Sequence, residues 1–219
     1  MGLTDFTKQP EICQLIKGTV KVDTTKPAKK SLVMPIKPFN NLFYSLGNIE
    51  ELPIKLLRTK TIAMLALVCM LRPSDIAPHS VKINPQGTTS KRIFSADQVT
   101  FDDGMKTVGL VFMGIKNDTD RSGFQVKLPA APQKALDPVS TLKCYMDRTD
   151  HIRSSVPGKP VFLTLQAPYT ALSADSVGNI LEDAISLAGL SHCGYTAKNF
   201  RPTGATFAIQ LGYDAEMVM

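Results

Sequence analysis

Closely spaced cysteines are missing from this sequence of 219 residues. Its four cysteines stand far apart and none belongs to a CxxC pair, whereas structural zinc sites are built from ligands at short spacing. The spacing is also unlike the disulfide framework of a small secreted domain. We therefore expect no bound metal and a reducing compartment inside the cell.

The sequence also has no long hydrophobic run and no glycine-rich phosphate loop. Its longest apolar run, residues 62–71, covers ten residues, which is about half of what a membrane-spanning helix needs. Residues 1–5 lack the basic and apolar regions of a signal peptide. The missing nucleotide fingerprint counts against a small-molecule enzyme that acts on an anionic substrate. These absences predict a buried helix at residues 62–71, no membrane partner and no cofactor.

The composition is that of a globular protein with an excess of positive charge. Hydrophobic residues make up 43% and charged residues 20%, so disorder is not expected to dominate. The 25 basic and 19 acidic residues give a net charge of +6. This balance suits a polyanion partner such as nucleic acid, although many enzymes without such a partner are equally basic.

A change in composition near the N-terminus predicts a domain boundary. Residues 23–30 (DTTKPAKK) have little apolar content, and their lysines and proline are typical of a solvated linker. The first ~20 residues are too few to fold alone. We expect residues 1–20 to be the end of an N-terminal domain, 21–34 a linker, and 35–219 a larger domain.

Hydrophobic periodicity predicts that most of this larger domain is helical. Apolar residues recur at helical spacing, and caps and breakers mark the helix ends. Pro53 suits the first turn of the second helix, Pro73 disfavours continuation past residue 72, and Gly189 stops a later helix. The predicted helices cover residues 39–46, 51–72, 74–77, 137–146, 173–188 and 197–212, with one or two further turns at 11–17.

A single cluster of strand signals interrupts the helices. Residues 98–101, 106–113 and 123–128 are rich in β-branched and aromatic side chains, and turn residues separate them. We expect a three-stranded antiparallel meander here, and a short extended segment at residues 160–165. The predicted fold class is thus mainly α with a small antiparallel β-sheet (α+β).

Several cations stand out by their context. Arg72 lies at the junction of the most apolar helix with the next, from which a guanidinium can reach into a cleft. An ordinary helix-end arginine, favoured by the helix dipole, would look the same. Lys116 lies in a predicted hairpin turn, where lysines are usually only solvated. Arg201 has Lys198 three residues earlier on the same helical face, which a surface basic pair would also explain.

In this order, the residues resemble the tyrosine recombinases and integrases. Residues 69–77 (CMLRPSDIA) are similar to the first arginine box of that family. This box consists of an apolar helix, a small residue and Leu-Arg, followed by another small residue, an acid and an apolar residue. A three-stranded sheet follows, with a lysine in its second turn, where Lys116 stands. The second box begins with His or Lys, then two residues and Arg, and residues 198–206 (KNFRPTGAT) through Gly212 fit it. The resemblance covers about residues 11–219.

The sequence departs from the family pattern at several positions. Lysine occupies position 198, where histidine is commonest, and Pro73 and Pro202 are unusual after the two arginines. Tyr213 lies too close to Arg201 to be the nucleophile, and we expect it to start a helix. The resemblance therefore implies a catalytic domain that is C-terminally incomplete, with its nucleophilic tyrosine beyond Met219.

The resemblance also implies a function. It predicts site-specific cleavage and rejoining of double-stranded DNA through a 3′-phosphotyrosine intermediate, without a metal. Arg72, Lys116, Lys198 and Arg201 are the implied catalytic residues, and residues 1–20 would end a DNA-clamping domain. Self-assembly on DNA through the C-terminal region, and a location with DNA in the nucleus or the bacterial cytoplasm, are further expectations. The alternative is a catalytically inactive or domesticated recombinase fold that binds DNA or packs in an assembly.

Overall fold

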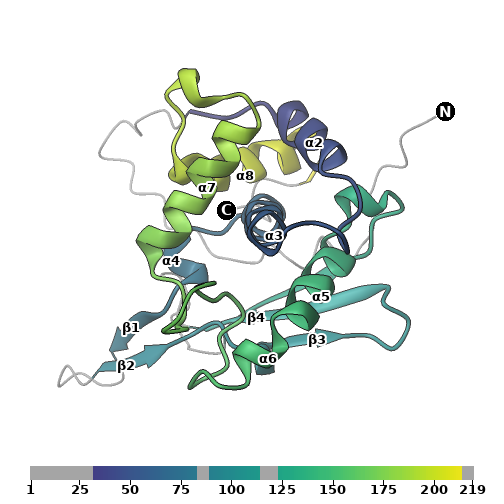
Figure 1. Cartoon of the computed structure of the whole chain (residues 1–219). Helices are drawn as coiled ribbons and strands as arrows, with labels where there is room; N and C mark the ends of the chain where they lie inside the picture. Colours follow the sequence, from purple (N-terminus) through teal and green to yellow (C-terminus); the bar gives the residue numbers. More distant parts are fainter. Residues whose placement is uncertain (1–31, 83–88, 114–122, 214–219) are drawn as a thin grey trace.

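The computed structural model describes residues 32–82, 89–113 and 123–213, and Figure 1 shows their arrangement. Helices make up most of this part of the chain, and short strands lie along one side of it (Figure 1). The α-helices are α2 (Ile36–Ser45), α3 (Ile54–Val68), α4 (Pro73–Ile76), α5 (Pro138–Arg148), α6 (Asp150–Arg153), α7 (Ala174–Leu187) and α8 (Phe200–Gln210).

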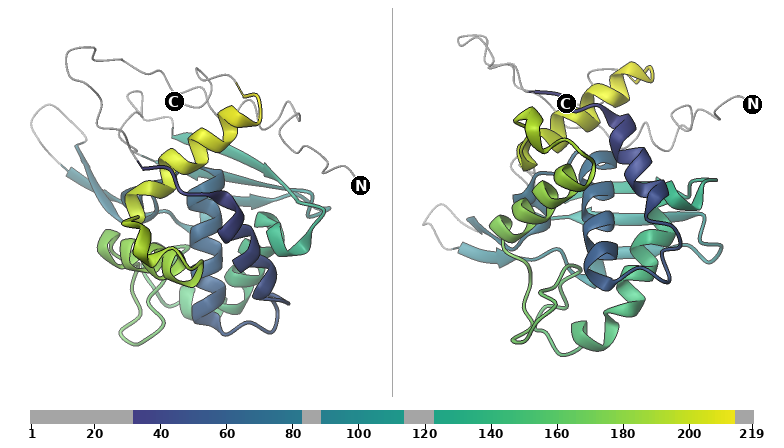
Figure 2. Two further views of the ribbon diagram at one scale, coloured as in Figure 1. Left: turned by 90° about the horizontal axis from the view of Figure 1, so that it is seen from above. Right: turned by 45° about the horizontal axis from the view of Figure 1, so that its top comes forward.

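Helix α3 is the centre of the fold. Figure 1 looks along its axis and shows α2, α5, α7 and α8 around it, and the views in Figure 2 agree. Every residue of α3 from 57 to 67 is buried, because other elements of the fold pack around this helix. The polar residues in this stretch bond to main-chain carbonyls: Lys60 Nζ donates to Phe43 O at 3.2 Å and Arg58 Nη1 to Leu163 O at 2.8 Å.

The strands form two antiparallel units. Strands β3 (Val99–Phe101), β4 (Thr107–Phe112) and β5 (Phe124–Pro129) make a meander in that order. Along β4 the side chains alternate between partly exposed and buried, and Val108, Leu110 and Phe112 face the core. A separate hairpin joins β1 (His79–Lys82) to β2 (Thr89–Arg92).

Caps at the predicted positions start two of the outer helices. The Asp137 carboxylate accepts hydrogen bonds from the main-chain amides of Val139 and Ser140 at the start of α5. The Ser173 hydroxyl accepts one from Ser176 N at the start of α7. These oxygens satisfy amide groups that have no partner within their own helix.

The structure confirms the predicted fold class and most of its elements. The helix predicted at 51–72 covers Ile54–Val68, and the helix predicted at 197–212 begins with a 3₁₀ turn, η6 (Ala197–Asn199), and continues as α8. The meander is confirmed, whereas the β1–β2 hairpin was not predicted. The turns expected at residues 11–17, the division at 1–20 and nearly all of the linker lie outside the described residues.

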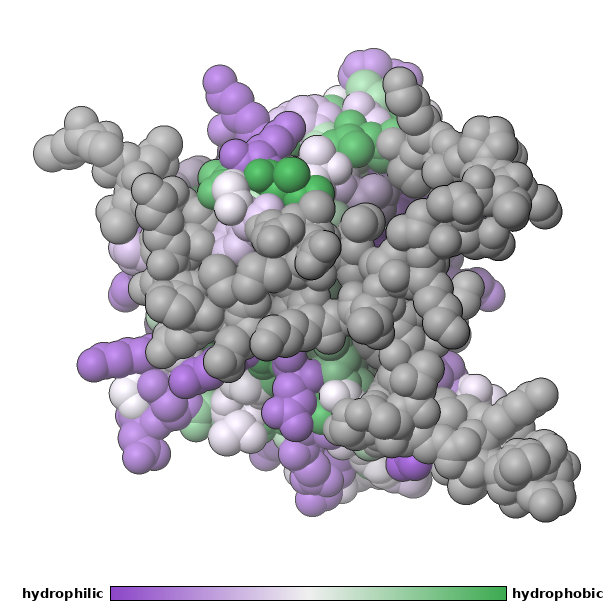
Figure 3. Space-filling view, turned by 180° about the vertical axis from the view of Figure 1, so that it is seen from behind, coloured by the Kyte–Doolittle hydropathy of each residue, from purple (hydrophilic) through white to green (hydrophobic). Residues whose placement is uncertain are grey.

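The described residues include no helix long and apolar enough to cross a membrane. Nor do His, Cys, Asp or Glu side chains within residues 32–82, 89–113 and 123–213 form a group of three or more that could hold a metal ion. On the face seen from behind, the hydrophobic surface that is visible lies in small patches next to hydrophilic side chains (Figure 3).

Candidate functional site

The joint between α3 and α4 is a tight turn built on an unusual backbone. Met70 follows the end of α3 with a φ of 53°, in the left-handed region that glycine normally occupies. Leu71 N donates to Ala66 O at 3.1 Å, which closes the turn over the last carbonyls of the helix. Leu71 is buried, so the chain leaves α3 in a fixed direction.

Arg72 is the residue on which α4 begins. Its amide donates to Asp75 Oδ2 at 2.8 Å, and Asp75 N donates back to Arg72 O at 2.9 Å, an arrangement that fixes the backbone of Arg72. Pro73 occupies the first helical position, where no amide donor is needed. The Arg72 side chain is half-buried, and its guanidinium makes no hydrogen bond to any residue that the structure describes.

Arg201 reaches the same place from the other end of the sequence. It lies in the first turn of α8, and its Nη1 donates to Met70 O at 3.4 Å. Burial lowers the pKa of Arg201, the positive charge of Arg72 lowers it further, and the carboxylate of Asp75 acts in the opposite direction. The two predicted arginines are therefore within electrostatic range of each other. Both remain cationic, because arginine is not deprotonated in proteins.

Gly204 makes this approach possible. A Cβ at position 204 would overlap the main-chain carbonyl oxygen of Leu67 and lie 3.2 Å from Met70 Cγ. The face of α8 that contains Gly204 thus rests directly on the backbone at the end of α3. Arg201 lies one helical turn earlier, so this contact sets how far the Arg201 side chain is from the joint at Met70.

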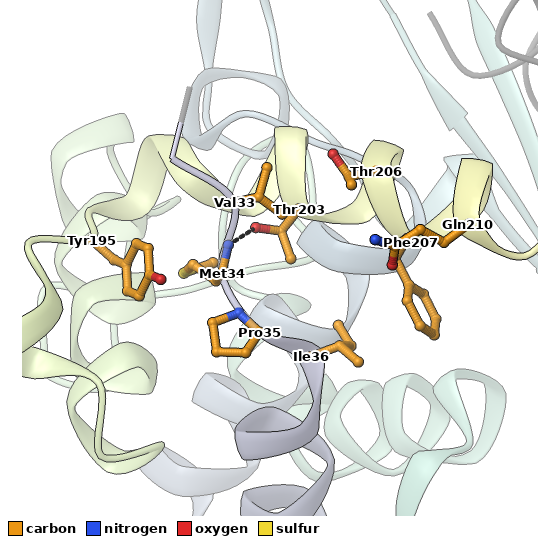
Figure 4. Close-up of a pocket in the computed structure, with 9 residues that line it drawn as sticks. All are labelled: Val33, Met34, Pro35, Ile36, Tyr195, Thr203, Thr206, Phe207 and Gln210. Atoms are coloured by element: carbon orange, nitrogen blue, oxygen red, sulfur yellow. Dashed lines mark hydrogen bonds between the residues drawn. The ribbon is translucent and has the colours of Figure 1, made fainter. Parts of the chain in front are cut away.

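The residues on either side of Arg201 hold the N-terminal segment of the described chain. Thr203 Oγ1 accepts a buried hydrogen bond from Met34 N at 2.9 Å, and Asn199 Nδ2 donates to Leu32 O at 2.7 Å. Figure 4 shows this segment crossing α8 beside a pocket of about 470 Å³. The pocket is lined by Val33, Met34, Pro35, Ile36, Tyr195, Thr203, Thr206, Phe207 and Gln210.

The other predicted site residues are not part of this pair. Lys198 lies in η6 with an exposed side chain, and no interaction of it with either arginine is found among the described residues. Lys116 lies outside the described residues. Tyr213 directly follows the Gly212 turn after α8 and is buried. Whether it starts a helix falls outside the description, because residues 214–219 are not described.

Sequence reasoning missed three residues that shape the site. Asp75 was noted as part of the first box, but its position three residues after Arg72 is the spacing of a capping box and predicts its structural role. Gly204 was noted only as a small residue, and a glycine inside a helix often marks a close contact. The left-handed conformation of Met70 has no sequence signal, because a non-glycine residue rarely adopts it.

The pair of arginines lies on a fold that is also seen in site-specific recombinases. No protein-family model and no curated protein matches the sequence. Among solved structures, the XerH site-specific recombinase bound to its difH substrate before cleavage matches with a TM-score of 0.58 and 13% identity, over 89% of this chain and 49% of that one. The post-cleavage complex with a palindromic difH substrate gives 0.61 and 15%, over 90% and 47%.

These likenesses define the fold and no more. The domain has the fold of a tyrosine-recombinase catalytic domain, as the sequence resemblance implied. The chain spans about half the length of the XerH chains that it matches. At 13% and 15% identity, the match carries no residue-by-residue assignment of the site.

Proposed function

We propose that this domain is the catalytic region of a site-specific recombinase that cleaves and rejoins double-stranded DNA. The observation that carries the proposal is the pairing of Arg72 with Arg201, two half-buried cations from distant parts of the sequence. Two like charges repel, so a protein gains little by placing them together unless an anion lies between them. A phosphodiester fits this arrangement, and the XerH complexes show that a protein of this fold binds DNA.

The arginines would act on the transition state of phosphodiester cleavage. Attack on the phosphorus atom builds negative charge on the two non-bridging oxygens. Guanidinium groups can bind these oxygens with charge-assisted, often bidentate hydrogen bonds, and donors held in place before reaction stabilise the developing charge. Arg72 suits this role because Asp75 and Pro73 fix its backbone while its own donors stay available.

Two lysines and a tyrosine complete the proposed reaction. Lys116 is proposed as the general acid that protonates the leaving 5′ oxygen, and Lys198 as a group that assists proton transfer or holds the phosphate. The nucleophile would be a tyrosine C-terminal to Met219, which forms the 3′-phosphotyrosine bond and conserves its energy for rejoining. Tyr213 is not proposed for this role because its side chain is buried, with 7% exposed. Self-assembly on DNA through that C-terminal region is part of the proposal.

The proposal is tested with a DNA duplex that carries a nick next to the cleavage site, so that a covalent adduct is trapped. The 219-residue chain and a protein extended through the natural C-terminus are compared by denaturing electrophoresis. We expect an adduct only from the extended protein, and none from its Arg72→Met or Arg201→Met variants. Lys134→Gln, which removes an exposed cation in the 3₁₀ turn η4 (Lys134–Leu136), is the control and should leave the adduct unchanged.

Two outcomes would change the conclusion. An adduct from the 219-residue chain that disappears in Tyr213→Phe would show that the nucleophile is Tyr213. If the extended protein binds DNA but forms no adduct, the alternative of an inactive recombinase fold that only binds DNA replaces the enzyme.

A further inference from the structure

The β1–β2 hairpin is attached directly to the candidate site. Only Ala77 and Pro78 separate the end of α4, which begins after Arg72, from the start of β1. At its other end the hairpin is followed by Phe94, whose ring lies 4.5 Å from that of Phe112 at the end of β4. In Figure 1 the two strands project from the body of the molecule below α4. The base of the hairpin is thus fixed beside the joint that carries Arg72.

The hairpin is basic and carries no compensating acid. From residue 76 to residue 96 the sequence contains no aspartate or glutamate, while Lys82, Lys91 and Arg92 lie within it. The Lys91 and Arg92 side chains are exposed, and neither forms an ion pair within the described part of the chain. Their charges are therefore free for an external anion.

The register of the hairpin places these two cations on opposite faces. Lys91 pairs with Ser80 and Arg92 with His79 across the ladder. Cross-strand partners share a face of a two-stranded ribbon, and neighbouring residues along a strand point to opposite faces. Each face of the ribbon consequently presents one of these two exposed cations.

We propose that this hairpin is a second DNA contact, in which Lys91 and Arg92 bind phosphates on the two sides of one groove. The inference rests on the proposed function, from which it takes DNA as the binding partner. It extends the bound DNA beyond the phosphate held at Arg72 and Arg201. A two-stranded ribbon fits the major groove of B-DNA. A ribbon that enters the groove edge-on has one face toward each DNA backbone. Cations on both faces of the ribbon therefore match phosphates on both DNA strands.

The surface of the hairpin fits DNA better than it fits a protein. Protein interfaces are built around a core of aromatic and aliphatic side chains with charge at the rim. The hairpin residues whose exposure the structure describes are all polar or charged: His79, Ser80, Lys91 and Arg92. Such side chains match a contact to phosphates, which positions the protein without reading the sequence.

The test is a salt titration of DNA binding by the 219-residue chain, followed by fluorescence anisotropy with a labelled duplex. Each phosphate contact contributes about 0.9 to the slope of log K against log salt concentration. The double variant Lys91→Gln/Arg92→Gln should therefore reduce the slope by about two contacts, or ~1.8. The control is the double variant Lys106→Gln/Lys134→Gln. It removes two exposed cations, Lys106 directly before β4, at the end away from Phe112, and Lys134 in η4. This control should keep the wild-type slope.

Arg72→Met separates this inference from the proposed function. If the hairpin variant lowers the slope and Arg72→Met leaves binding unchanged, the hairpin contact stands and the proposed phosphate site fails. If the hairpin variant keeps the wild-type slope, the inference is overturned whatever Arg72→Met does. A chain that binds no duplex overturns both. Circular dichroism of each variant shows that the fold is retained.

Discussion

Arg153 and Arg201 are both withdrawn from solvent, yet their donors are used in different ways. The Arg153 side chain is 2% exposed. Its Nε donates to Pro160 O and its Nη1 to Met146 O, while Nη2 donates to both Thr149 Oγ1 and Val161 O, all between 2.6 and 3.1 Å. Arg153 therefore fastens the segment after α6 to the end of α5.

Within the described part of the chain, Arg201 has one such bond, the 3.4 Å contact with Met70 O, and the nearby charge of Arg72 disfavours the Arg201 cation. A buried arginine with four of its five N–H donors bonded to the protein, as in Arg153, stabilises the fold. A half-buried arginine with free donors beside a second cation costs stability and gains its value from a ligand. The number of donors left without a protein partner thus separates a structural arginine from a candidate functional one.

The largest effect should come from Arg153→Met, which removes the structural arginine. The substitution leaves several buried carbonyls without donors, and we expect it to lower the free energy of unfolding by roughly 3–5 kcal/mol. Urea denaturation followed by circular dichroism measures this loss. A loss no larger than that of Arg201→Met would contradict the distinction between the two arginines.

Gly204→Ala should have the next largest effect, because it acts on the distance between α8 and α3. The new methyl group meets the Leu67 carbonyl, and the overpacking should cost about 1–3 kcal/mol and weaken DNA binding. Gly178→Ala is the matched control, since Gly178 is also helical but has open space around it. That control should be neutral or stabilising by up to ~1 kcal/mol. Equal thermal stability of the two variants would rule out the close contact.

A loss of about the same size is expected for Thr203→Val, which leaves the buried amide of Met34 without its acceptor. An unsatisfied buried donor costs about 1–3 kcal/mol. Thr206→Val, at a residue of the same helix that also lines the pocket, serves as the control. Hydrogen exchange should show faster exchange of the Met34 amide in Thr203→Val alone. Unchanged exchange would exclude the bond.

The smallest effect on stability is expected for Arg201→Met. This variant is the sharpest test of the difference between Arg153 and Arg201. Burial and the charge of Arg72 both disfavour the Arg201 cation, so the variant should unfold at the same denaturant concentration or a slightly higher one. Its affinity for duplex DNA should fall roughly tenfold or more, the effect of one lost charge-assisted contact. A variant that loses stability but keeps its DNA affinity would make Arg201 a structural residue.

The sequence predicted the elements whose signal is local. Helices α2, α3, α5, α7 and α8 and the meander follow from hydrophobic periodicity and caps, and the structure confirms them. The β1–β2 hairpin escaped prediction because its strands, HSVK and TSKR, show no apolar alternation. Its pairing depends on main-chain hydrogen bonds, which leave little trace in the sequence.

The sequence could name candidate residues for the site but not their geometry. The order of the two boxes indicated Arg72 and Arg201. Pro202, which departs from the family pattern, is tolerated because it lies in the first turn of α8, where amides need no helical partner. The proximity of the arginines depends on Gly204 and on the left-handed Met70. Both are tertiary features that no periodicity encodes. The catalytic roles of Arg72, Lys116, Lys198 and Arg201 stay predictions.

The two hydrogen bonds beside Arg201 also form a mechanical linkage. Asn199 holds Leu32, Thr203 holds Met34, and both lie within two residues of Arg201. A shift of residues 32–34 would therefore act on η6 and on the first turn of α8 as well as on α2, which begins two residues after Met34. The arginine that would grip the phosphate is in this way coupled to the segment that leads into α2.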